Sequence, residues 1–121
     1  MPRTTLTPVT PLGPYPTLPV AANALDLTWT AADTVNLNQF LLNGRKLLLA
    51  RNVHATTAFT FTLTSIADSK KRTGDIGPFT LQAGEVAAFL IDQSEGWIQT
   101  DGYLYLQGSD ASIQFCVVTL P

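Results

Sequence analysis

Hydrophobic and polar residues alternate along much of the chain, and this alternation predicts β-strands. From Phe59 to Thr64, phenylalanine and leucine occupy one set of positions and threonine the other. A period of two places successive side chains on opposite faces of an extended strand, whereas a helix repeats about every 3.6 residues. The same alternation runs over Leu25–Thr30 and Tyr103–Gln107. The chain therefore predicts antiparallel sheet with one buried and one polar face.

Turn residues separate further apolar runs. We expect additional strands over Phe40–Leu42, Lys46–Ala50, Phe79–Gln82, Val86–Ile91, Trp97–Thr100 and Ser112–Leu120. Asn43-Gly44 and Asp101-Gly102 favour tight hairpin turns, because both dipeptides accept positive φ angles. Residues 33–42 fit neither period well, and Asp33 is a candidate cap for a short helical turn. About eight short strands without a clear helix predict an all-β fold, an antiparallel β-sandwich of jelly-roll-like connectivity.

Two of the expected strands are apolar on both faces. One spans Leu47–Ala50. In the other, at the end of the chain, one face carries Ile113, Phe115 and Val117, and the opposite face carries Cys116, Val118 and Leu120. A strand of this kind needs cover on both sides. The cover comes either from the chain's own arm and loops or from another subunit, since large exposed apolar patches mark interfaces.

Proline dominates the start of the chain, with six prolines at positions 2, 8, 11, 14, 16 and 19. Proline fixes φ and lacks a backbone N–H, so this stretch suits neither a helix nor a central strand. We therefore divide the chain into an extended arm over residues 1–24 and a β-sandwich domain over residues 25–121. Ordering a free arm costs about 1–2 kcal/mol per residue. The arm is thus either a disordered tail or a segment that becomes ordered on a neighbouring subunit.

Composition limits the classes of partner. Charged residues make up 13% of the 121 residues, against roughly 25% in ordinary soluble domains, so the surface is covered by Thr, Ser, Gln and Asn or by other protein. A net charge of −2 disfavours nucleic-acid and membrane-surface binding. We expect synthesis in the cytosol, because the opening residues Met1–Thr5 lack the apolar core of a secretory signal and the longest apolar run, Val86–Ile91, is too short to span a bilayer.

Side chains with catalytic chemistry are sparse. His54 is the single histidine and is expected at a loop or strand end without a catalytic role, while Glu85 and Glu95 lie beside glycines in turns. Cys116 lies in an apolar strand and is interpreted as a buried, inert thiol. Residues 67–75 carry three basic residues between acidic ones, which favours a solvated loop over a phosphate, sugar or calcium site. We predict no catalytic, cofactor-binding or metal-binding residue, and no cofactor.

From residue 25 onward the chain carries an ordered series of short motifs. They are Asn43–Asn52 (NGRKLLLARN), Thr60–Ser65 (TFTLTS), Arg72–Ile76 (RTGDI), Ala83-Gly84-Glu85 followed by Ala87–Phe89, Glu95-Gly96-Trp97 and Asp101–Leu106 (DGYLYL). Together they resemble small β-sandwich proteins encoded among the head genes of tailed phages, which include head decoration, or cement, proteins. The resemblance implies a structural virion protein on the outer capsid surface, commonly a homotrimer. Such a protein binds the major capsid protein and clamps neighbouring capsomers after the shell expands.

On this hypothesis the chain is not an enzyme and binds neither nucleic acid nor membrane. We expect subunit and capsid contacts on the arm and on the two strands with two apolar faces. The candidate residues are Leu12, Tyr15, Leu18, Val20, Leu48, Cys116, Val118 and Leu120.

Two alternatives stay open. One is a carbohydrate- or receptor-binding sandwich on a virion tail or fibre, in which Trp29, Trp97, Tyr103 and Tyr105 stack on sugars. The other, which has less support, is a small hydrolase that uses aspartates.

Overall fold

The computed structural model of the chain describes residues 3–10, 27–68, 70, 71, 73–92 and 95–120. These residues form nine strands: β1 (Thr4–Thr5), β2 (Thr30–Ala31), β3 (Asn38–Leu41), β4 (Lys46–Asn52), β5 (Phe59–Thr64), β6 (Ile76–Leu81), β7 (Val86–Ile91), β8 (Tyr103–Gly108) and β9 (Ile113–Thr119). The described residues contain no helix. Accordingly, no helix in this part of the chain has the length and hydropathy needed to cross a membrane.

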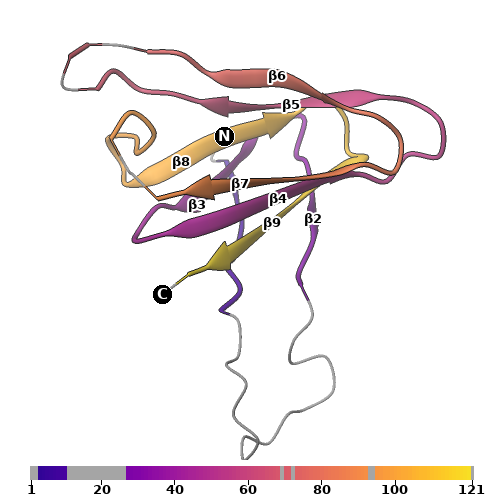
Figure 1. Cartoon of the computed structure of the whole chain (residues 1–121), viewed down its shortest axis with the longest axis horizontal. Coiled ribbons are helices and arrows are strands. Elements are labelled where there is room, and N and C mark those ends of the chain that lie inside the picture. Colours follow the sequence, from indigo (N-terminus) through magenta and orange to yellow (C-terminus); the bar gives the residue numbers. More distant parts are fainter. Residues whose placement is uncertain (1–2, 11–26, 69, 72, 93–94, 121) are drawn as a thin grey trace, which may run out of the picture.

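The strands form two sheets, one in the order β1-β3-β8-β5-β6 and the other in the order β2-β9-β4-β7 (Figure 1). If the eight strands from β2 to β9 are renumbered 1 to 8, the smaller sheet has the order 1-8-3-6. The larger sheet, without β1, then has the order 2-7-4-5. This is the strand order of a jelly roll. The all-β, jelly-roll-like sandwich predicted from the alternation is confirmed.

Most consecutive strands lie in opposite sheets, which corrects one local prediction. Asn43-Gly44 does not close a hairpin, because it connects β3 of the larger sheet to β4 of the smaller sheet. Gly44 has the expected positive φ of 76°, so the dipeptide does turn the chain, but the turn leads from one layer to the other. Strand pairing is set by the jelly-roll order: β3 pairs with β8, and β4 lies between β9 and β7.

A second correction concerns the strand expected over Trp97–Thr100, since these residues form turns and irregular structure and no strand. The backbone N–H of Gln99 donates to the Tyr103 carbonyl at 2.8 Å, and that of Gly102 donates to the Gln99 carbonyl at 2.9 Å. These bonds reverse the chain within a few residues and leave no length for a strand. Near Asp33, the carboxylate accepts N–H bonds from Val35 and Asn36; it thereby caps a turn that does not continue into a helix.

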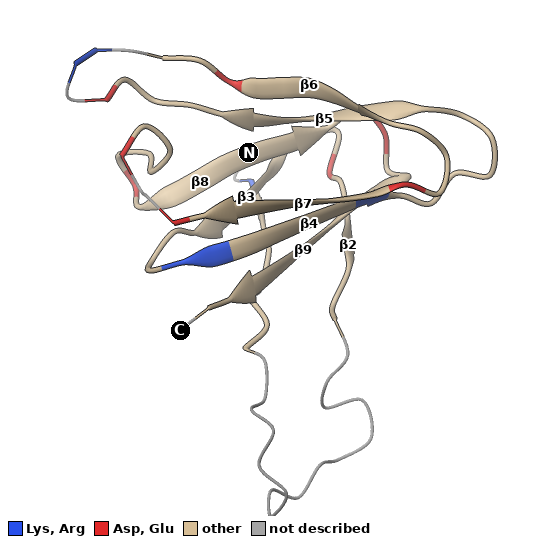
Figure 2. Ribbon diagram, in the orientation of Figure 1, with Lys and Arg blue, Asp and Glu red and all other residues tan. Residues whose placement is uncertain are grey.

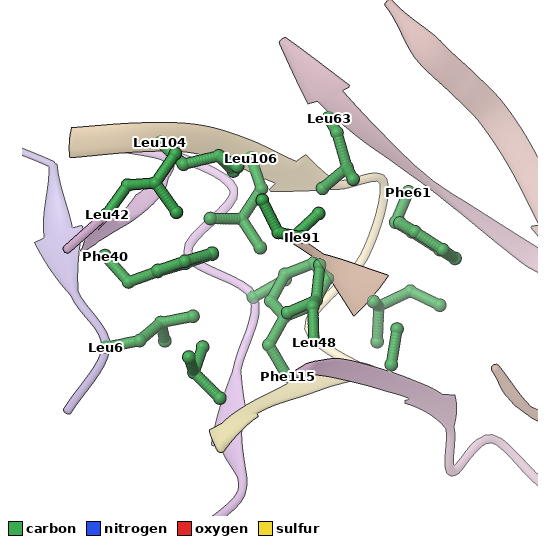
Figure 3. Packing of buried hydrophobic residues seen from close by; sticks show 14 of the residues in the cluster. Leu6, Phe40, Leu42, Leu48, Phe61, Leu63, Ile91, Leu104, Leu106 and Phe115 are labelled. Atoms are coloured by element: carbon green, nitrogen blue, oxygen red, sulfur yellow. The ribbon is translucent and has the colours of Figure 1, made fainter. Parts of the chain in front are cut away.

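The core lies between the two sheets. It is built from alternate residues of each strand, as the period of two requires. Phe40, Phe61, Leu63, Leu104 and Leu106 from the larger sheet meet Leu48, Ala50, Ile113, Phe115 and Val117 from the smaller sheet (Figure 3). The Phe61 ring lies at the centre of an aromatic cluster, with ring centroids of Phe79, Phe89 and Phe115 at 5.5, 5.6 and 6.1 Å.

Residues 3–10 join the sandwich along one side. Strand β1 pairs in parallel with β3, Leu6 is only 3% exposed within the core, and Val9 forms a parallel bridge with Val118 of the other sheet. This segment therefore crosses from one sheet to the other. Of the arm predicted over residues 1–24, the structure describes residues 3–10, while residues 1, 2 and 11–24 lie outside the described residues.

Candidate interaction surface

The outer side of the smaller sheet is largely apolar. Alternate residues of β4, β7 and β9 that point away from the core form one continuous surface, which we call the apolar face. It consists of Leu47, Leu49, Val86, Ala88, Leu90, Cys116 and Val118. The strand register arranges these residues in cross-strand rows, with Val118, Leu47 and Leu90 in one row and Cys116, Leu49 and Ala88 in the next. Directly opposed residues of this kind are close enough to pack together.

The exposed part of the apolar face lies over β7. Val86 is 61% exposed and Leu90 49% exposed, whereas Cys116 and Val118 are only 2% and 7% exposed. Leu47 and Leu49 of the central strand β4 are half-buried. Contiguous exposed apolar surface of this kind marks interaction sites in soluble proteins.

Arg51 and Trp29 border the apolar face on one side. The Arg51 guanidinium lies 4.1 Å from the centroid of the Trp29 ring, and its Nε donates a hydrogen bond to Oε1 of Gln114 at 2.9 Å. A guanidinium in contact with an aromatic ring is attracted by the negative ring face. The border is therefore polar and ordered, as expected for the rim of a protein interface.

The structure places the predicted contact residues in different surroundings. Cys116 and Val118 belong to the apolar face and are covered by their own chain, and Leu120, just beyond β9, is half-buried. Leu48 is 0% exposed and points into the core, so it packs within the sandwich rather than against a partner. Its neighbours Leu47 and Leu49 point outward instead. Leu12, Tyr15, Leu18 and Val20 lie outside the described residues.

The outer side of the larger sheet has the opposite character. Threonine, tyrosine and glutamine cover it, namely Thr60, Thr62, Thr64, Tyr103, Tyr105 and Gln107, all of them half-buried. The Tyr105 hydroxyl donates to Oδ2 of Asp101 at 2.6 Å. Arg3 lies over the same ring, with its guanidinium carbon 4.0 Å from the centroid, and its Nη1 donates to the Asn38 carbonyl at 3.0 Å.

This cluster shifts the pKa of each of its three charged or phenolic groups. The hydrogen bond from Tyr105 lowers the pKa of the Asp101 carboxyl, and the same bond raises the pKa of the Tyr105 hydroxyl. Burial lowers the pKa of the Arg3 guanidinium. The Arg3 guanidinium also covers one face of the Tyr105 ring, so that face is not free to stack on a sugar.

The four aromatic residues of the carbohydrate hypothesis are not brought together. Tyr103 and Tyr105 lie on the outer side of the larger sheet, Trp29 contacts Arg51 beside the apolar face, and Trp97 packs against the core. The two tyrosines and Trp29 therefore face opposite sides of the sandwich.

No family model, no curated protein and no solved structure matches this chain.

Within the described residues, no group of three or more His, Cys, Asp or Glu side chains could hold a metal ion. Nδ1 of His54 accepts hydrogen bonds from the backbone N–H groups of Thr56 and Thr57 at 3.1 and 3.0 Å, so this nitrogen is used in holding a turn.

In the loop with several basic residues, Oδ1 of Asp75 accepts hydrogen bonds from both the backbone N–H and the hydroxyl of Ser65. That loop lines a pocket of about 270 Å³ together with Glu95, Gly96 and Trp97, and Asp68 is among the loop residues that line it.

Sequence reasoning missed the exposed members of the apolar face. Val86, Ala88 and Leu90 alternate with Ala87, Phe89 and Ile91, so every position of β7 is apolar and the pattern does not say which set points outward. The burial of Cys116 agrees with the inert thiol expected from the sequence. Burial raises the pKa of the Cys116 thiol against a smaller opposing effect of a hydrogen bond with the Thr28 backbone, which favours the protonated, unreactive form.

Proposed function

We propose that this chain is a structural virion protein that binds the outside of a phage capsid and joins neighbouring copies of the major capsid protein. The observation that carries the proposal is the apolar face on the outer side of the smaller sheet, with Val86 and Leu90 exposed at its edge. The ordered motifs that resemble phage head proteins give this interaction surface a specific partner. The jelly-roll order adds a weaker, fold-level analogy, because this fold occurs in viral capsid proteins and also in lectins.

The function would rest on mass action. A protein that binds the assembled mature shell, and not the separated or unfolded subunits, stabilises the shell by the free energy of binding. Many contacts of modest strength, repeated over every equivalent position of the lattice, then add up to a large effect. The polar outer side of the larger sheet would face the solvent, and the apolar face would pack against the shell.

A single charge in the apolar face tests this proposal. Leu49 lies in the central strand of that face, between Cys116 and Ala88, so Leu49→Glu puts a carboxylate in the middle of the contact. Thr62→Glu, on the outer side of the larger sheet, is the matched control, and circular dichroism confirms that both variants fold. Phage heads assembled without the protein are mixed with each form, sedimented and imaged by electron microscopy.

We expect the native protein and Thr62→Glu to co-sediment with heads and to raise the temperature at which the shells break. Leu49→Glu should do neither. Equal decoration by Leu49→Glu would refute the role of the apolar face. If the native protein does not co-sediment with the heads but binds a defined glycan, the result would instead support the carbohydrate-binding alternative.

The arm is tested separately, because deleting residues 2–20 would also remove β1, Leu6 and Val9 from the sandwich. Replacing Leu12, Tyr15, Leu18 and Val20 by serine leaves residues 3–10 in place. If the arm contacts the shell or a neighbouring copy, this variant keeps its unfolding temperature and loses head binding. Unchanged binding would remove the arm from the proposal.

A further inference from the structure

Strand β7 forms an open edge of the smaller sheet. It pairs with β4 on one side and is the last strand in the order β2-β9-β4-β7. Its six residues, Val86–Ile91, contain no proline and no charge (Figure 2). Proteins usually protect long edge strands of this kind with charges, prolines or bulges, because free backbone groups pair with other chains.

The other strands at the ends of the two sheets lack this combination of length and apolar sequence. Strands β1 and β2 have two residues each. Strand β6 contains Pro78, which follows Gly77 in a cis peptide bond, and its pairing with β5 shifts register between Phe61 and Leu63. Among the strands of the described residues, β7 is therefore the one suited to accept another strand.

The hydrogen bonds of β4 define which backbone groups of β7 are available. The N–H of Asn52 donates to the Glu85 carbonyl at 3.0 Å, so Asn52 and every second residue before it direct their backbone groups toward β7. Their partners are Ala87, Phe89 and Ile91. The backbone groups of Val86, Ala88 and Leu90 consequently point to the free edge, and these same residues carry exposed side chains of the apolar face.

We propose that β7 pairs antiparallel with β7 of a second copy of this chain about a two-fold axis, with Ala88 opposite Ala88 of the partner subunit. In this register Val86 lies opposite Leu90 of the partner subunit, and the reverse contact follows by symmetry. Each of these pairs exchanges two backbone hydrogen bonds, because all three residues direct their N–H and C=O groups outward. The two four-stranded sheets become one sheet of eight strands.

The chemistry of the strand favours its own copy as the partner. No charged residue lies within β7, so the two-fold axis brings no like charges together within the strand. On the core side, small Ala87 lies opposite large Phe89 of the partner subunit. Glu85 and Asp92 at the two ends lie opposite Ile91 and Gly84 of the partner subunit, so neither acid faces an acid directly. A two-fold contact also uses both free edges and closes at two copies.

The size of the contact sets its expected strength. A strand pair of five residues a side is much smaller than a standard interface of about 20–30 residues a side. Phe79 of β6 is 43% exposed, and its ring contacts the ring of Phe89 in β7. A second copy of β7 paired at this edge therefore covers part of the Phe79 ring. We expect a dimer with a dissociation constant on the order of micromolar.

Sedimentation velocity of the full chain from about 1 µM to about 1 mM tests this proposal. The native protein should shift from monomer to dimer. Ala88→Pro removes one N–H that faces the free edge and leaves the bonds to β4 intact, and Ala88→Lys places two like charges face to face. Both should raise the dissociation constant about tenfold or more. Thr80→Lys, on exposed edge strand β6, is the control and should dimerise like the native protein.

A charge pair tests the register itself. Val86→Lys should weaken the dimer, and Val86→Lys combined with Leu90→Glu should restore it, because each lysine then faces a glutamate of the partner subunit. Amide exchange of Val86, Ala88 and Leu90 should slow as the protein concentration rises. A monomer at every concentration, a trimer such as the phage resemblance implies, or a dimer unaffected by Ala88→Lys would each overturn the proposal. The result is independent of head binding, which is measured on its own.

Discussion

Val9 lies beside Val118 in a parallel bridge that ties the start of the chain to its last strand. The N–H of Val9 donates to the Val117 carbonyl, and the N–H of Thr119 donates to the Val9 carbonyl, both at 2.8 Å. Strand β2 occupies the neighbouring part of the same β9 edge, opposite Gln114 and Phe115. Two separate segments thus cover β9 on its free side, and the smaller sheet is left with β7 as its open edge.

This relationship makes residues 3–10 part of the stability of the sandwich, and Leu6 is the residue that tests it. Leu6→Ala should lower the free energy of unfolding by about 2–5 kcal/mol, the usual cost of truncating a buried leucine. Urea unfolding followed by tryptophan fluorescence measures the change. The control is Val35→Ala at a position that is 82% exposed, where a change within about 0.5 kcal/mol is expected. Equal stability of the two variants would show that the segment does not hold the sheets together.

The sequence could predict β5 from its alternation and β7 from its apolar run, but it could not predict β1. Alternation over Leu25–Thr30 also predicted a strand, yet residues 27–29 form none and β2 covers only Thr30–Ala31. Phe59–Thr64 and Val86–Ile91 were predicted with the observed boundaries. In contrast, Thr4-Thr5 is too short to show a period, and Pro2 and Pro8 on either side favour an extended arm. An extended segment is nevertheless what an edge position accepts. Only the three-dimensional neighbours β3 and β9 distinguish a free arm from a paired segment.

The candidate surface was harder to predict because both faces of β4 are apolar. Leu47 and Leu49 alternate with Leu48 and Ala50, and each set also includes a charged residue. Arg51 shares the outward face, whereas Lys46 shares the inward face, where it is 2% exposed and donates from Nζ to the Thr119 hydroxyl at 3.2 Å. Charge therefore gives no signal about which face is the core, and the choice of Leu48 as a contact residue followed from this ambiguity.

Asn52 provides a second test of stability at the end of β4. It is 1% exposed; Nδ2 donates to the Thr57 and Leu81 carbonyls at 2.9 Å, and Oδ1 accepts the His54 N–H at 2.9 Å. Asn52→Leu keeps the size of the side chain but leaves three backbone groups without these partners. We expect a loss of about 1–3 kcal/mol in the free energy of unfolding, the usual cost of one unsatisfied buried group, because the bond to the Leu81 carbonyl is buried whereas the bonds to Thr57 and His54 are partly exposed.

The matched control for Asn52 is Gln107→Leu, which replaces a half-buried amide on the outer side of β8. Its effect should stay within about 0.5 kcal/mol, the usual range for surface positions. Chemical denaturation of both variants at the same pH provides the comparison. If Asn52→Leu is as stable as the native protein, the buried amide network does not anchor β4 to β6.

We expect the stability of the protein to depend on pH through the Asp33 carboxyl. Hydrogen bonds from the Thr4 hydroxyl and from the backbone of Asn36 and Val35 lower the pKa of the Asp33 carboxyl from 3.8 to about 2. A carboxyl with a lowered pKa stabilises the fold when ionised. Its contribution is complete above the unfolded-state pKa of 3.8 and is lost as the pH falls through about 2.

The pH prediction is checked by NMR titration of the Asp33 carboxyl and by unfolding temperatures between about pH 5 and pH 2. Thr4→Val removes the largest contribution and should move the pKa back toward 3.8. Asp33→Asn should lose part of the native pH dependence over the same range. Thr62→Val, which removes a threonine hydroxyl elsewhere, should leave the Asp33 titration unchanged. An Asp33 pKa near 3.8 in the native protein would contradict the hydrogen bonds to this carboxylate.

We expect the buried Cys116 thiol to react only when the structure opens. Its side chain is 2% exposed, and burial raises its pKa, so both access and the thiolate form are limited. Labelling of the native protein at neutral pH should be at least about a hundredfold slower than labelling in urea. Thr80→Cys in a Cys116→Ser background places a thiol on exposed strand β6 and should react at the rate of the unfolded chain. If native Cys116 reacts as quickly as this control, the covered side of the apolar face opens readily, and that side would be available to a partner as well.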